Sequence, residues 1–232
     1  MVSQPQSLNV VKETKSKLLE HEAFEILSKY NIPHPPYALA RTPEEAGKVA
    51  AEIGFPVVLK IVSPDISHKT DVGGVILGVS GPEEAIKSAE LIFKNVKERA
   101  PNARIEGVLV QKMAPKGLEV IVGGLVDPVF GITLMFGLGG VFTEVFKDVT
   151  FRVWPITIDD AVDMINEIKS SVVLKGFRGM PPVDIRSIAD IIVKLGKILE
   201  DRPDIETADL NPVLAYPNGA LAIDARFILK LS

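Results

Sequence analysis

Three oxygen-bearing side chains stand within two apolar runs near the C-terminus, and few folds can accommodate them. Asp209 and Asn211 lie in ADLNPVLAY, and Asp224 lies in ALAIDARFIL. The intervening Pro-Asn-Gly predicts a hairpin that brings Asp224 alongside Asn211, and the two-residue period of a strand turns Asp209 and Asn211 to one face. Two carboxylates and an amide oxygen so placed favour a hard cation such as Mg²⁺ between them. The alternative, Asp and Asn as turn formers, does not explain carboxylates inside apolar strands.

The preceding chain alternates helical and extended patterns. The strongest helix start is Thr42-Pro43-Glu44-Glu45, because Thr caps a helix and Pro fits its first position. Helices are expected over residues 9–30, 42–53, 82–100, 158–170 and 184–200. Strands are expected in FPVVLKIVS, VILGVS, EGVLVQKMA, LEVIVGGLVD and FGITLMFG, and in the C-terminal hairpin. This order predicts an α+β fold with an N-terminal helical segment (1–30) and two lobes (31–103 and 104–232).

Composition excludes several classes of function. The 232 residues contain no cysteine, which excludes disulfides, iron–sulfur clusters, thiol catalysis and cysteine-ligated zinc. With a net charge of −4, the chain lacks the basic surface of a nucleic-acid-binding protein. No apolar stretch reaches the ~18 residues of a membrane span, and the first residues lack the apolar core of a signal peptide. We therefore expect a cytoplasmic protein that binds neither nucleic acid nor membrane.

Two cationic side chains are candidates for contact with an anion. Lys60 lies inside the apolar strand VVLKIVS, so its ammonium group must reach either solvent at a sheet edge or an anion such as a phosphate. His68 lies in the polar loop PDISHKTDVGG, where it is either a surface residue or part of a ligand-binding loop. The same loop offers side-chain donors and a backbone open to close approach, from Ser67, Lys69, Gly73 and Gly74.

A second glycine-rich segment runs from Gly137 to Gly140. Its sequence, GLGG, matches neither the phosphate loop of P-loop enzymes nor the dinucleotide-binding fingerprint GxGxxG. It therefore gives no support to either of those folds. The segment is either a simple turn between strands or a flexible backbone cradle at the mouth of a cleft.

Four segments carry a resemblance to a known family. They are FPVVLKIVSPDISHKTDVGGV, VLVQKMAPKGLEVIVGGLVDPVFG, FGLGGVFTEVFKDVTFR and ADLNPV. From EAFEILSKYNIPHPPYALA to the C-terminal AIDAR, the chain resembles the ATP-grasp beta subunit of ADP-forming acetyl-CoA (acyl-CoA) synthetases, which are related to succinyl-CoA synthetase. The resemblance implies an ATP-grasp fold whose nucleotide cleft lies between two lobes. It also implies ADP or ATP as substrate and Mg²⁺ as cofactor.

The resemblance further implies roles for individual residues. Lys60 resembles the lysine over the nucleotide phosphates, and Glu119 resembles a nucleotide-contacting glutamate. Asn211 and Asp224 resemble the magnesium ligands. Two further sets resemble the adenine-holding connection between the lobes and the loop that faces an incoming phosphohistidine: Gln111, Lys112 and Met113 for the first, and Gly139 and Gly140 for the second.

Two departures from the succinyl-CoA synthetase pattern point to the acetyl-CoA synthetases. Succinyl-CoA synthetase has a glutamate in place of Asp209 and an arginine-containing glycine loop near the position of His68, whereas the ADP-forming acetyl-CoA synthetases have an aspartate and a loop histidine. In the mechanism held for that family, the loop histidine accepts phosphate from a partner-subunit histidine and passes it to ADP. The resemblance thus implies that His68 is a second phosphohistidine and that Asp209 orients a histidine during transfer.

The chain shows no fingerprint for binding coenzyme A or an acid. In the family these sites belong to a separate alpha subunit or domain, so the resemblance implies half of an enzyme, commonly an α2β2 heterotetramer, for acetyl-CoA + ADP + phosphate = acetate + ATP + CoA. One alternative is a stand-alone ATP-grasp ligase that joins a carboxylate to an amine, which normally needs its own acceptor pocket and no loop histidine. The other is a non-catalytic ATP-grasp module. The second is disfavoured by the retention of Lys60, His68, Asp209, Asn211 and Asp224.

Overall fold

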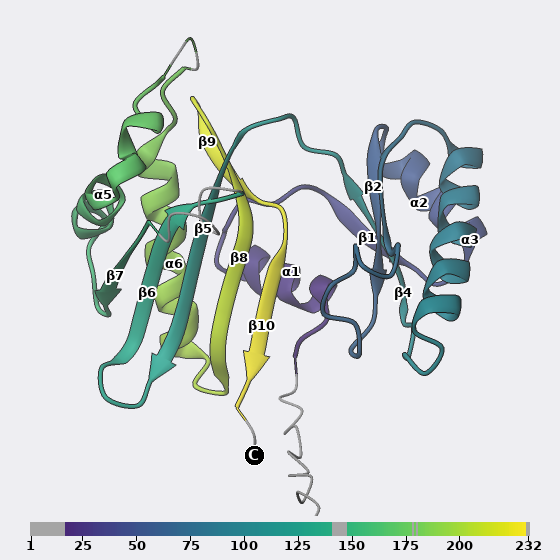
Figure 1. Ribbon diagram of the computed structural model, residues 1–232, viewed down its shortest axis with the longest axis horizontal. Coiled ribbons are helices and arrows are strands. Elements are labelled where there is room, and N and C mark those ends of the chain that lie inside the picture. The colour runs from purple at the N-terminus through teal and green to yellow at the C-terminus, as the bar shows by residue number, and fades with distance from the viewer. Residues whose placement is uncertain (1–16, 141–147, 178, 180, 231–232) are drawn as a thin grey trace, which may run out of the picture.

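The computed structural model describes residues 17–140, 148–177, 179 and 181–230, which form two lobes, each built on an antiparallel sheet (Figure 1). The first sheet has the order β1-β4-β2-β3, with α2 and α3 packed on it. Its elements are β1 (Tyr37–Ala40), α2 (Pro43–Ile53), β2 (Val57–Val62), β3 (Val75–Val79), α3 (Pro82–Arg99) and β4 (Gly107–Lys112). Most of their buried side chains form a core of their own, whereas Val62 and Leu109 join the core of the second lobe.

The second sheet has the order β10-β8-β5-β6-β7, and β9 pairs with β8. Helices α5 and α6 cover one of its faces, as Figure 1 shows. Its strands are β5 (Leu118–Asp127), β6 (Gly131–Leu138), β7 (Val149–Val153), β8 (Ile205–Tyr216), β9 (Gly219–Ala222) and β10 (Ala225–Leu229). The helical elements are α5 (Ile158–Glu167), the 3₁₀ turn η1 (Lys169–Val173) and α6 (Ile185–Asp201). The expected α+β fold in two lobes is therefore observed.

Helix starts follow the capping signals of the sequence. The amide of Glu45 donates to the Thr42 hydroxyl over 3.2 Å, and α2 ends at Gly54, whose φ of 84° is open to glycine at little cost. Thr157 caps α5 in the same way, with the side chain of Asp160 accepting from the Thr157 amide. The helix expected over 158–170 ends earlier, at Glu167, and the 3₁₀ turn follows it.

The N-terminal helix is shorter than its pattern and belongs to the second lobe. The pattern predicts a helix over 9–30, whereas α1 covers Glu20–Lys29 and residues 9–16 lie outside the described residues. Its buried Phe24 and Leu27 join the same core as Phe227 of β10. The first residues of α1 therefore come to lie between the two lobes.

The change from one lobe to the other occurs later than residues 103/104. Strand β4 is paired on both sides within the first sheet, with Leu39 opposite Leu109 and Leu59 opposite Val110. The chain thus leaves the first sheet only after Lys112 and enters the second at Leu118. The order of the expected helices and strands suggested the earlier boundary, but hydrogen-bonded pairing across the sheet determines where β4 belongs.

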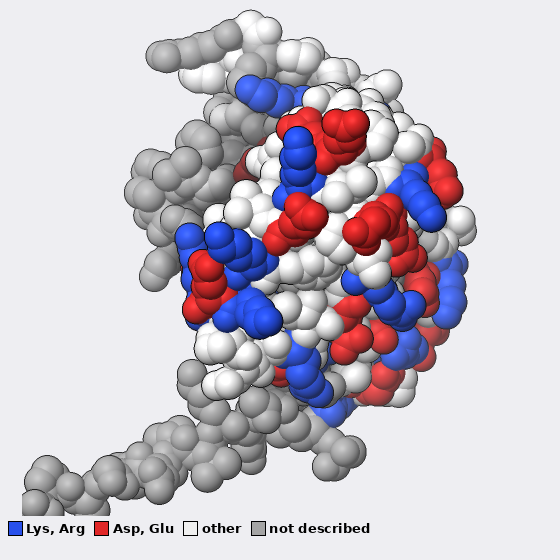
Figure 2. All heavy atoms as spheres, turned by 90° about the vertical axis from the view of Figure 1, so that its right-hand side faces the viewer, with Lys and Arg blue, Asp and Glu red and all other residues white. Residues whose placement is uncertain are grey.

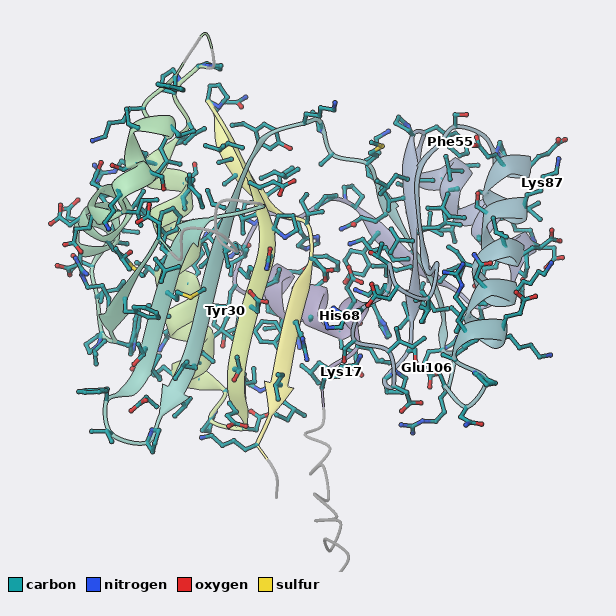
Figure 3. The ribbon with its side chains drawn as sticks, viewed as in Figure 1. Lys17, Tyr30, Phe55, His68, Lys87 and Glu106 are labelled. Carbon is teal, nitrogen blue, oxygen red and sulfur yellow. The ribbon has the colours of Figure 1, made fainter. Side chains whose placement is uncertain are left out.

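The surface of the first lobe carries both signs of charge. Figure 2 faces this lobe, and its acidic and basic side chains are interspersed rather than gathered into a patch of one sign. Lys87 on α3 points outward from the lobe, away from the space between the sheets (Figure 3). Among the described residues, no helix is long and apolar enough to cross a membrane.

Candidate functional site

The C-terminal hairpin places its polar residues as its pattern predicts. Val213 of β8 lies opposite Ala222 of β9, and Leu210 of β8 lies opposite Ala225 of β10. The register is continuous between these pairs, so Asp224 falls opposite Asn211 where β9 gives way to β10. The alternation along β8 buries Leu210 on the helix-covered face and turns Asp209 and Asn211 to the free face, toward the first lobe.

A buried network of charges joins this hairpin to the first lobe. Nζ of Lys60 lies 2.6 Å from Oε1 of Glu20 and donates to the carbonyl of Ile223 over 2.9 Å. Nζ of Lys69 lies 2.7 Å from Oε2 of Glu20 and 3.3 Å from Oδ2 of Asp224. The Glu20 side chain is only 4% exposed. Burial of these charges is tolerable because each has a partner of opposite sign.

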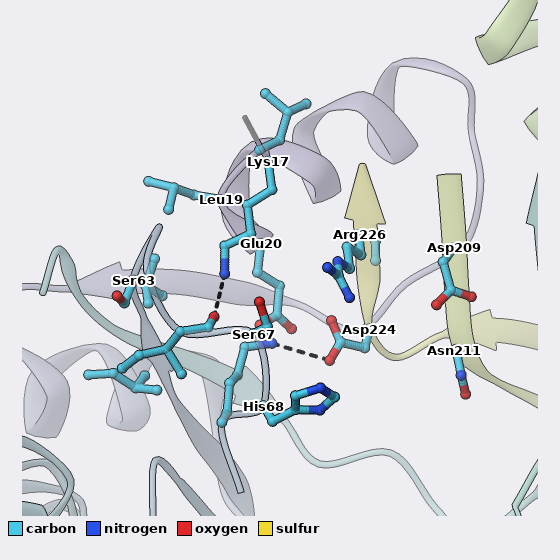
Figure 4. Close-up of a pocket in the computed structure, with 16 residues that line it drawn as sticks. Lys17, Leu19, Glu20, Ser63, Ser67, His68, Asp209, Asn211, Asp224 and Arg226 are labelled. Carbon is cyan, nitrogen blue, oxygen red and sulfur yellow. Dashed lines mark hydrogen bonds and ion pairs between the residues drawn. The ribbon is translucent and has the colours of Figure 1, made fainter. Parts of the chain in front are cut away.

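Two cavities meet at this network. The first, of about 240 Å³, is lined by Lys17, Asp209, Asn211 and Arg226 among others (Figure 4). The second, of about 420 Å³, is lined by Lys60, Thr70, Val75, Pro212 and Ile223 among others. Four residues line both cavities, namely Ser67, His68, Lys69 and Asp224. We call the place that they occupy, where the two cavities adjoin, the partition.

The carboxylates of the partition region have perturbed pKa values. Burial raises the pKa of Asp209, and the nearby charge of Asp224 raises it further, while Arg226 opposes the shift. Burial and the charge of Glu20 raise the pKa of Asp224 against the pull of Lys60 and Lys69. Carboxyl groups that resist ionisation in this way gain from a nearby cation.

The donor set at the hairpin fits Mg²⁺. It offers oxygen atoms from Asp209, Asn211 and Asp224, with an unfavourable interaction between the two carboxylates. In the part of the chain that the structure describes, three His, Cys, Asp or Glu side chains nowhere gather in a way that could hold a metal ion. A partial shell of this kind suits Mg²⁺, which completes its six ligands with water and phosphate oxygens rather than in an all-protein cage.

The residues expected at the nucleotide base occupy the end of β4. The side chain of Gln111 is buried and donates to the Ile223 carbonyl over 3.3 Å, so it shares this acceptor with Lys60. The side chain of Lys112 points away from the cleft, because its Nζ donates to the carbonyls of Gly54 and Phe55. The backbone amides of Lys112 and Met113 are engaged by the carbonyls of Pro36 and Pro56.

Glu119 and the second glycine segment lie together. The Gly139 amide donates to the Glu119 carbonyl over 2.7 Å. A Cβ atom at Gly139 would come within 2.9 Å of the Glu119 Cβ, so only glycine permits this approach. Gly140 lies beside the Glu119 carboxylate and has a φ of 66°. The part of the loop beyond it, residues 141–147, lies outside the described residues.

The glycines after His68 serve the packing of their loop. A Cβ at Gly74 would lie 2.4 Å from Cγ2 of Ile61, and the Gly74 carbonyl accepts from the Ile61 amide. Gly73, with a φ of 65°, lies against Asn95 of α3. Neither glycine lines the two cavities, whereas Ser67, His68 and Lys69 do.

Sequence reasoning missed three residues of the site. They are Lys17, Glu20 and Arg226, all of which line the first cavity. A signal for Glu20 did exist, because a lysine inside an apolar strand requires an anionic partner. The sequence alone does not identify which acidic residue is that partner, since the chain contains 30 Asp and Glu residues.

Comparison with known proteins decides the family. The model of the ATP-grasp domain matches residues 9–229. The chain belongs to the ATP-grasp family. It is 51% identical over 91% of each chain to the beta subunit of acetate–CoA ligase (ADP-forming) I of Pyrococcus furiosus, and so belongs among the beta subunits of these ligases.

Solved structures agree with this placement of the ATP-grasp chain. An acetyl-coenzyme A synthetase 1 of Ca. Korarchaeum cryptofilum, in complex with coenzyme A, Ca-AMPCP and HgCl⁺, matches with a TM-score of 0.91 and 53% identity over 93% of this chain and 94% of that one. Another structure of that enzyme holds coenzyme A and Mg-AMPPCP, with its phosphohistidine segment pointing towards the nucleotide-binding site. Its TM-score is 0.82, with 49% identity over 93% of each chain. The expected fold, family and enzyme class are confirmed.

Proposed function

We propose that this beta subunit passes a phosphoryl group from a phosphohistidine of its partner to His68, and from His68 to ADP. The overall reaction is acetyl-CoA + ADP + phosphate = acetate + ATP + CoA. The observation that carries the proposal is the position of His68, which lines both cavities and lies between the lobes (Figure 3). An imidazole at the partition can take a group on one side and release it on the other.

The second cavity suits the nucleotide and the first suits the arriving phosphohistidine. Ala215 of β8 lies opposite Leu118, where β5 begins after the connection between the lobes. Pro212, which lines the second cavity, is closer to Ala215 along β8 than Asp209, which lines the first. Adenine at the connection, near Gln111 and Met113, would place the phosphates at Lys60 and the partition. Asp209 is then on the partner's side, where a carboxylate can orient an imidazole through its N–H.

Each transfer is a displacement at phosphorus. A ring nitrogen of His68 forms a bond to phosphorus with its lone pair, and the partner's imidazole leaves with the electrons of the broken P–N bond. In the second transfer, an oxygen of the β-phosphate of ADP forms the new P–O bond while the His68 P–N bond breaks. Such reactions depend mainly on positioning and on neutralisation of charge. Lys60 and Lys69, which line the second cavity, can supply both. The same role for the Gly139–Gly140 backbone rests on the family resemblance.

The metal and the nucleotide complete the assignment. Asn211 and Asp224 are the residues that would hold Mg²⁺, whose charge neutralises phosphate oxygens when it is bound. Glu119, beside Gly139 and Gly140, would contact the nucleotide. Gln111, Lys112 and Met113 would lie against adenine, although the Lys112 side chain and the amides of Lys112 and Met113 have partners within the chain.

The relatives support a partner subunit. Their name as beta subunits implies an alpha chain, and the similar Korarchaeum enzyme has a phosphohistidine segment that points towards its nucleotide-binding site. We propose a coenzyme A-binding alpha subunit in an α2β2 heterotetramer, in the cytoplasm. The isolated beta chain is then expected to bind ADP but to make no ATP from acetyl-CoA and phosphate until the alpha subunit is added.

Labelling tests the relay. Radiolabelled ATP is expected to label both subunits of the wild-type complex, and the label on the beta chain is expected to be acid-labile. The variant His68→Ala should lose the beta label and at least about 10³-fold in ATP formation, as when a covalent nucleophile is removed. His34→Gln is the matched control, because His34 contacts Ser28 and Pro35 and lines neither cavity. ATP formation by His68→Ala near the wild-type rate would refute the relay.

A further inference from the structure

Glu20 is a buried carboxylate to which the reaction above gives no role. It stands at the start of α1, and its two oxygens contact two different lysines, Lys60 of β2 and Lys69 of the loop. The two lysines reach it from the first lobe, whereas α1 packs against β10 of the second. One carboxylate thus joins the lobes at the partition between the cavities.

The partners of Lys60 and Lys69 among the described residues do not use all of the N–H donors of these side chains. An ammonium group has three N–H donors. Lys60 uses two of them on Glu20 and the Ile223 carbonyl. Lys69 donates to Asp224 and forms an ion pair with Glu20. Each lysine therefore keeps one N–H for a further acceptor, and both lysines line the second cavity.

The cost of the arrangement argues against a purely structural role. Removing several charges from water costs several kcal/mol for each ion, and apolar side chains of similar volume often replace such clusters without loss of stability. An apolar side chain of similar volume at this place would avoid that cost. What an apolar residue could not do is fix two ammonium groups at defined points beside His68.

We propose that Glu20 is a positioning residue for phosphoryl transfer, which fixes Lys60 and Lys69 so that the free N–H of each meets the phosphoryl group at the partition. The inference rests on the proposed function. Misplacement of such groups by about an ångström can cost on the order of 10²-fold in rate. Glu20 acts through the two lysines that its oxygens contact.

The variant Glu20→Gln separates this role from a structural one. The amide keeps the volume of the carboxylate but presents N–H donors to one of the lysines. We expect kcat for ATP formation by the complex to fall about 10²-fold. Loss of the negative charge leaves Lys60 and Lys69 more attractive to phosphates, so ADP should bind roughly threefold more tightly. A partly unfolded sample cannot bind ADP more tightly, whereas mispositioned lysines can.

Two further variants complete the test. Glu25→Gln makes the same change at an exposed position of the same helix and should leave kcat and the dissociation constant of ADP unchanged. Glu20→Asp keeps the charge but is one methylene too short to span both lysines, so kcat should fall by about tenfold with ADP binding at full stoichiometry. If Glu20→Gln does not fold, the kcat of Glu20→Asp tests the inference by itself.

The outcomes separate the two proposals. Wild-type labelling of His68 tests the relay, and the Glu20 variants test positioning in a complex that is already active. The inference is overturned if Glu20→Gln turns over at the wild-type rate, if its ADP affinity falls in parallel with kcat, or if Glu20→Asp retains wild-type kcat. It is supported if tighter ADP binding accompanies slower turnover.

Discussion

The two walls of the cleft differ in how their charges are paired. On the wall formed by β2 and the loop after it, Lys60 and Lys69 each have two partners within 3.3 Å. On the wall formed by β8, no hydrogen bond or ion pair is found for the side chains of Asp209 and Asn211 among the described residues. The lysines of the first wall, which we propose to face phosphate oxygens, are thus held by carboxylates and a carbonyl of the chain itself. The carboxylate of the second wall, which we propose to lie near a cation, is held by charge interactions alone within the described part of the chain.

The pKa values follow the same division. Glu20 and Asp224 raise the pKa of Lys69, outweighing the burial that lowers it. Lys60 and Lys69 lower the pKa of Glu20 although burial acts in the opposite direction. On the opposite wall, burial and repulsion raise the pKa of Asp209. The charged state is favoured on one wall and opposed on the other.

The largest effect is expected at Asp224, which contacts Lys69 of the first wall and lies opposite Asn211 of the second. Asp224→Ala removes a proposed metal ligand and a partner of Lys69 together, so ATP formation should fall by about 10³-fold. Asn211→Ala removes a ligand without touching Lys69 and should raise the Mg²⁺ concentration for half-maximal rate by about tenfold. Titration of the rate with Mg²⁺ checks both, and an unchanged Mg²⁺ dependence in both variants would disprove the metal assignment.

The next effect tests the lysine wall alone. Lys60→Met keeps the length of the side chain but removes the charge over the proposed phosphate site, so kcat/KM for ADP should fall by about 10²-fold. Lys87→Met, on the outer surface of α3, is the control and should leave ADP use unchanged. Steady-state kinetics of the complex at varied ADP measures both. A loss shared equally by the two variants would mean that general charge, not Lys60, attracts the nucleotide.

A smaller effect tests the carboxylate wall through its pH dependence. Because the pKa of Asp209 is raised above 3.8, the folded state holds this proton more tightly than the unfolded state. Its contribution to the free energy of unfolding therefore decreases as the pH rises from about 3.8 through the raised pKa. Asp209→Asn should raise Tm by a few degrees at pH 7 without Mg²⁺, and change it little at pH 3.

Asp204, whose pKa is lowered rather than raised, is the control for this prediction. Arg202 lowers the pKa of Asp204 through side-chain hydrogen bonds, so Asp204→Asn should lower Tm slightly at pH 7 or leave it unchanged. Thermal unfolding followed by circular dichroism at the two pH values measures both variants. A fall in Tm at pH 7 for Asp209→Asn would show that this wall is already neutralised.

The smallest effect concerns an exposed pair near the lysine wall. Arg104 donates to Asp65 and lowers the pKa of that carboxyl to about 2. Both groups are open to solvent, where ion pairs contribute little. Asp65→Asn should therefore shift Tm by no more than roughly a degree and leave ATP formation unchanged. A larger fall in Tm, or a loss of ATP formation, would mean that surface ion pairs also position Lys60 and Lys69.

Local patterns predicted what depends on neighbours in sequence. Period-two alternation and the Pro-Asn-Gly turn indicated the strands and the position of Asp224 opposite Asn211, because a hairpin's register depends on its own turn. The apolar context of Lys60 predicted that its ammonium group reaches either solvent or an anion, and the structure shows a carboxylate partner. Its identity as Glu20 could not be predicted, because the pairing depends on how α1 packs against β10, at the other end of the sequence.

The lobe boundary shows the same limit. The order of the expected elements indicated a boundary after residue 103, yet β4 continues the first sheet by pairing with β1 and β2. Lys112 resembles an adenine-holding residue by position, but its side chain is directed to Gly54 and Phe55 by the fold of a distant loop. Positions along the backbone were predictable, and side-chain directions that depend on packing were not.

The Ile223 carbonyl accepts hydrogen bonds from Lys60 and Gln111, and the ribosome adds it to the chain long after either of them. Lys60 is translated 163 residues before this acceptor, and Lys69 is translated 155 residues before Asp224. The first lobe can leave the ribosome with its sheet complete while these cations still lack their last partners. A nascent or C-terminally truncated chain would thus contain a finished lobe without a finished site, and ADP binding would report that translation has reached β10.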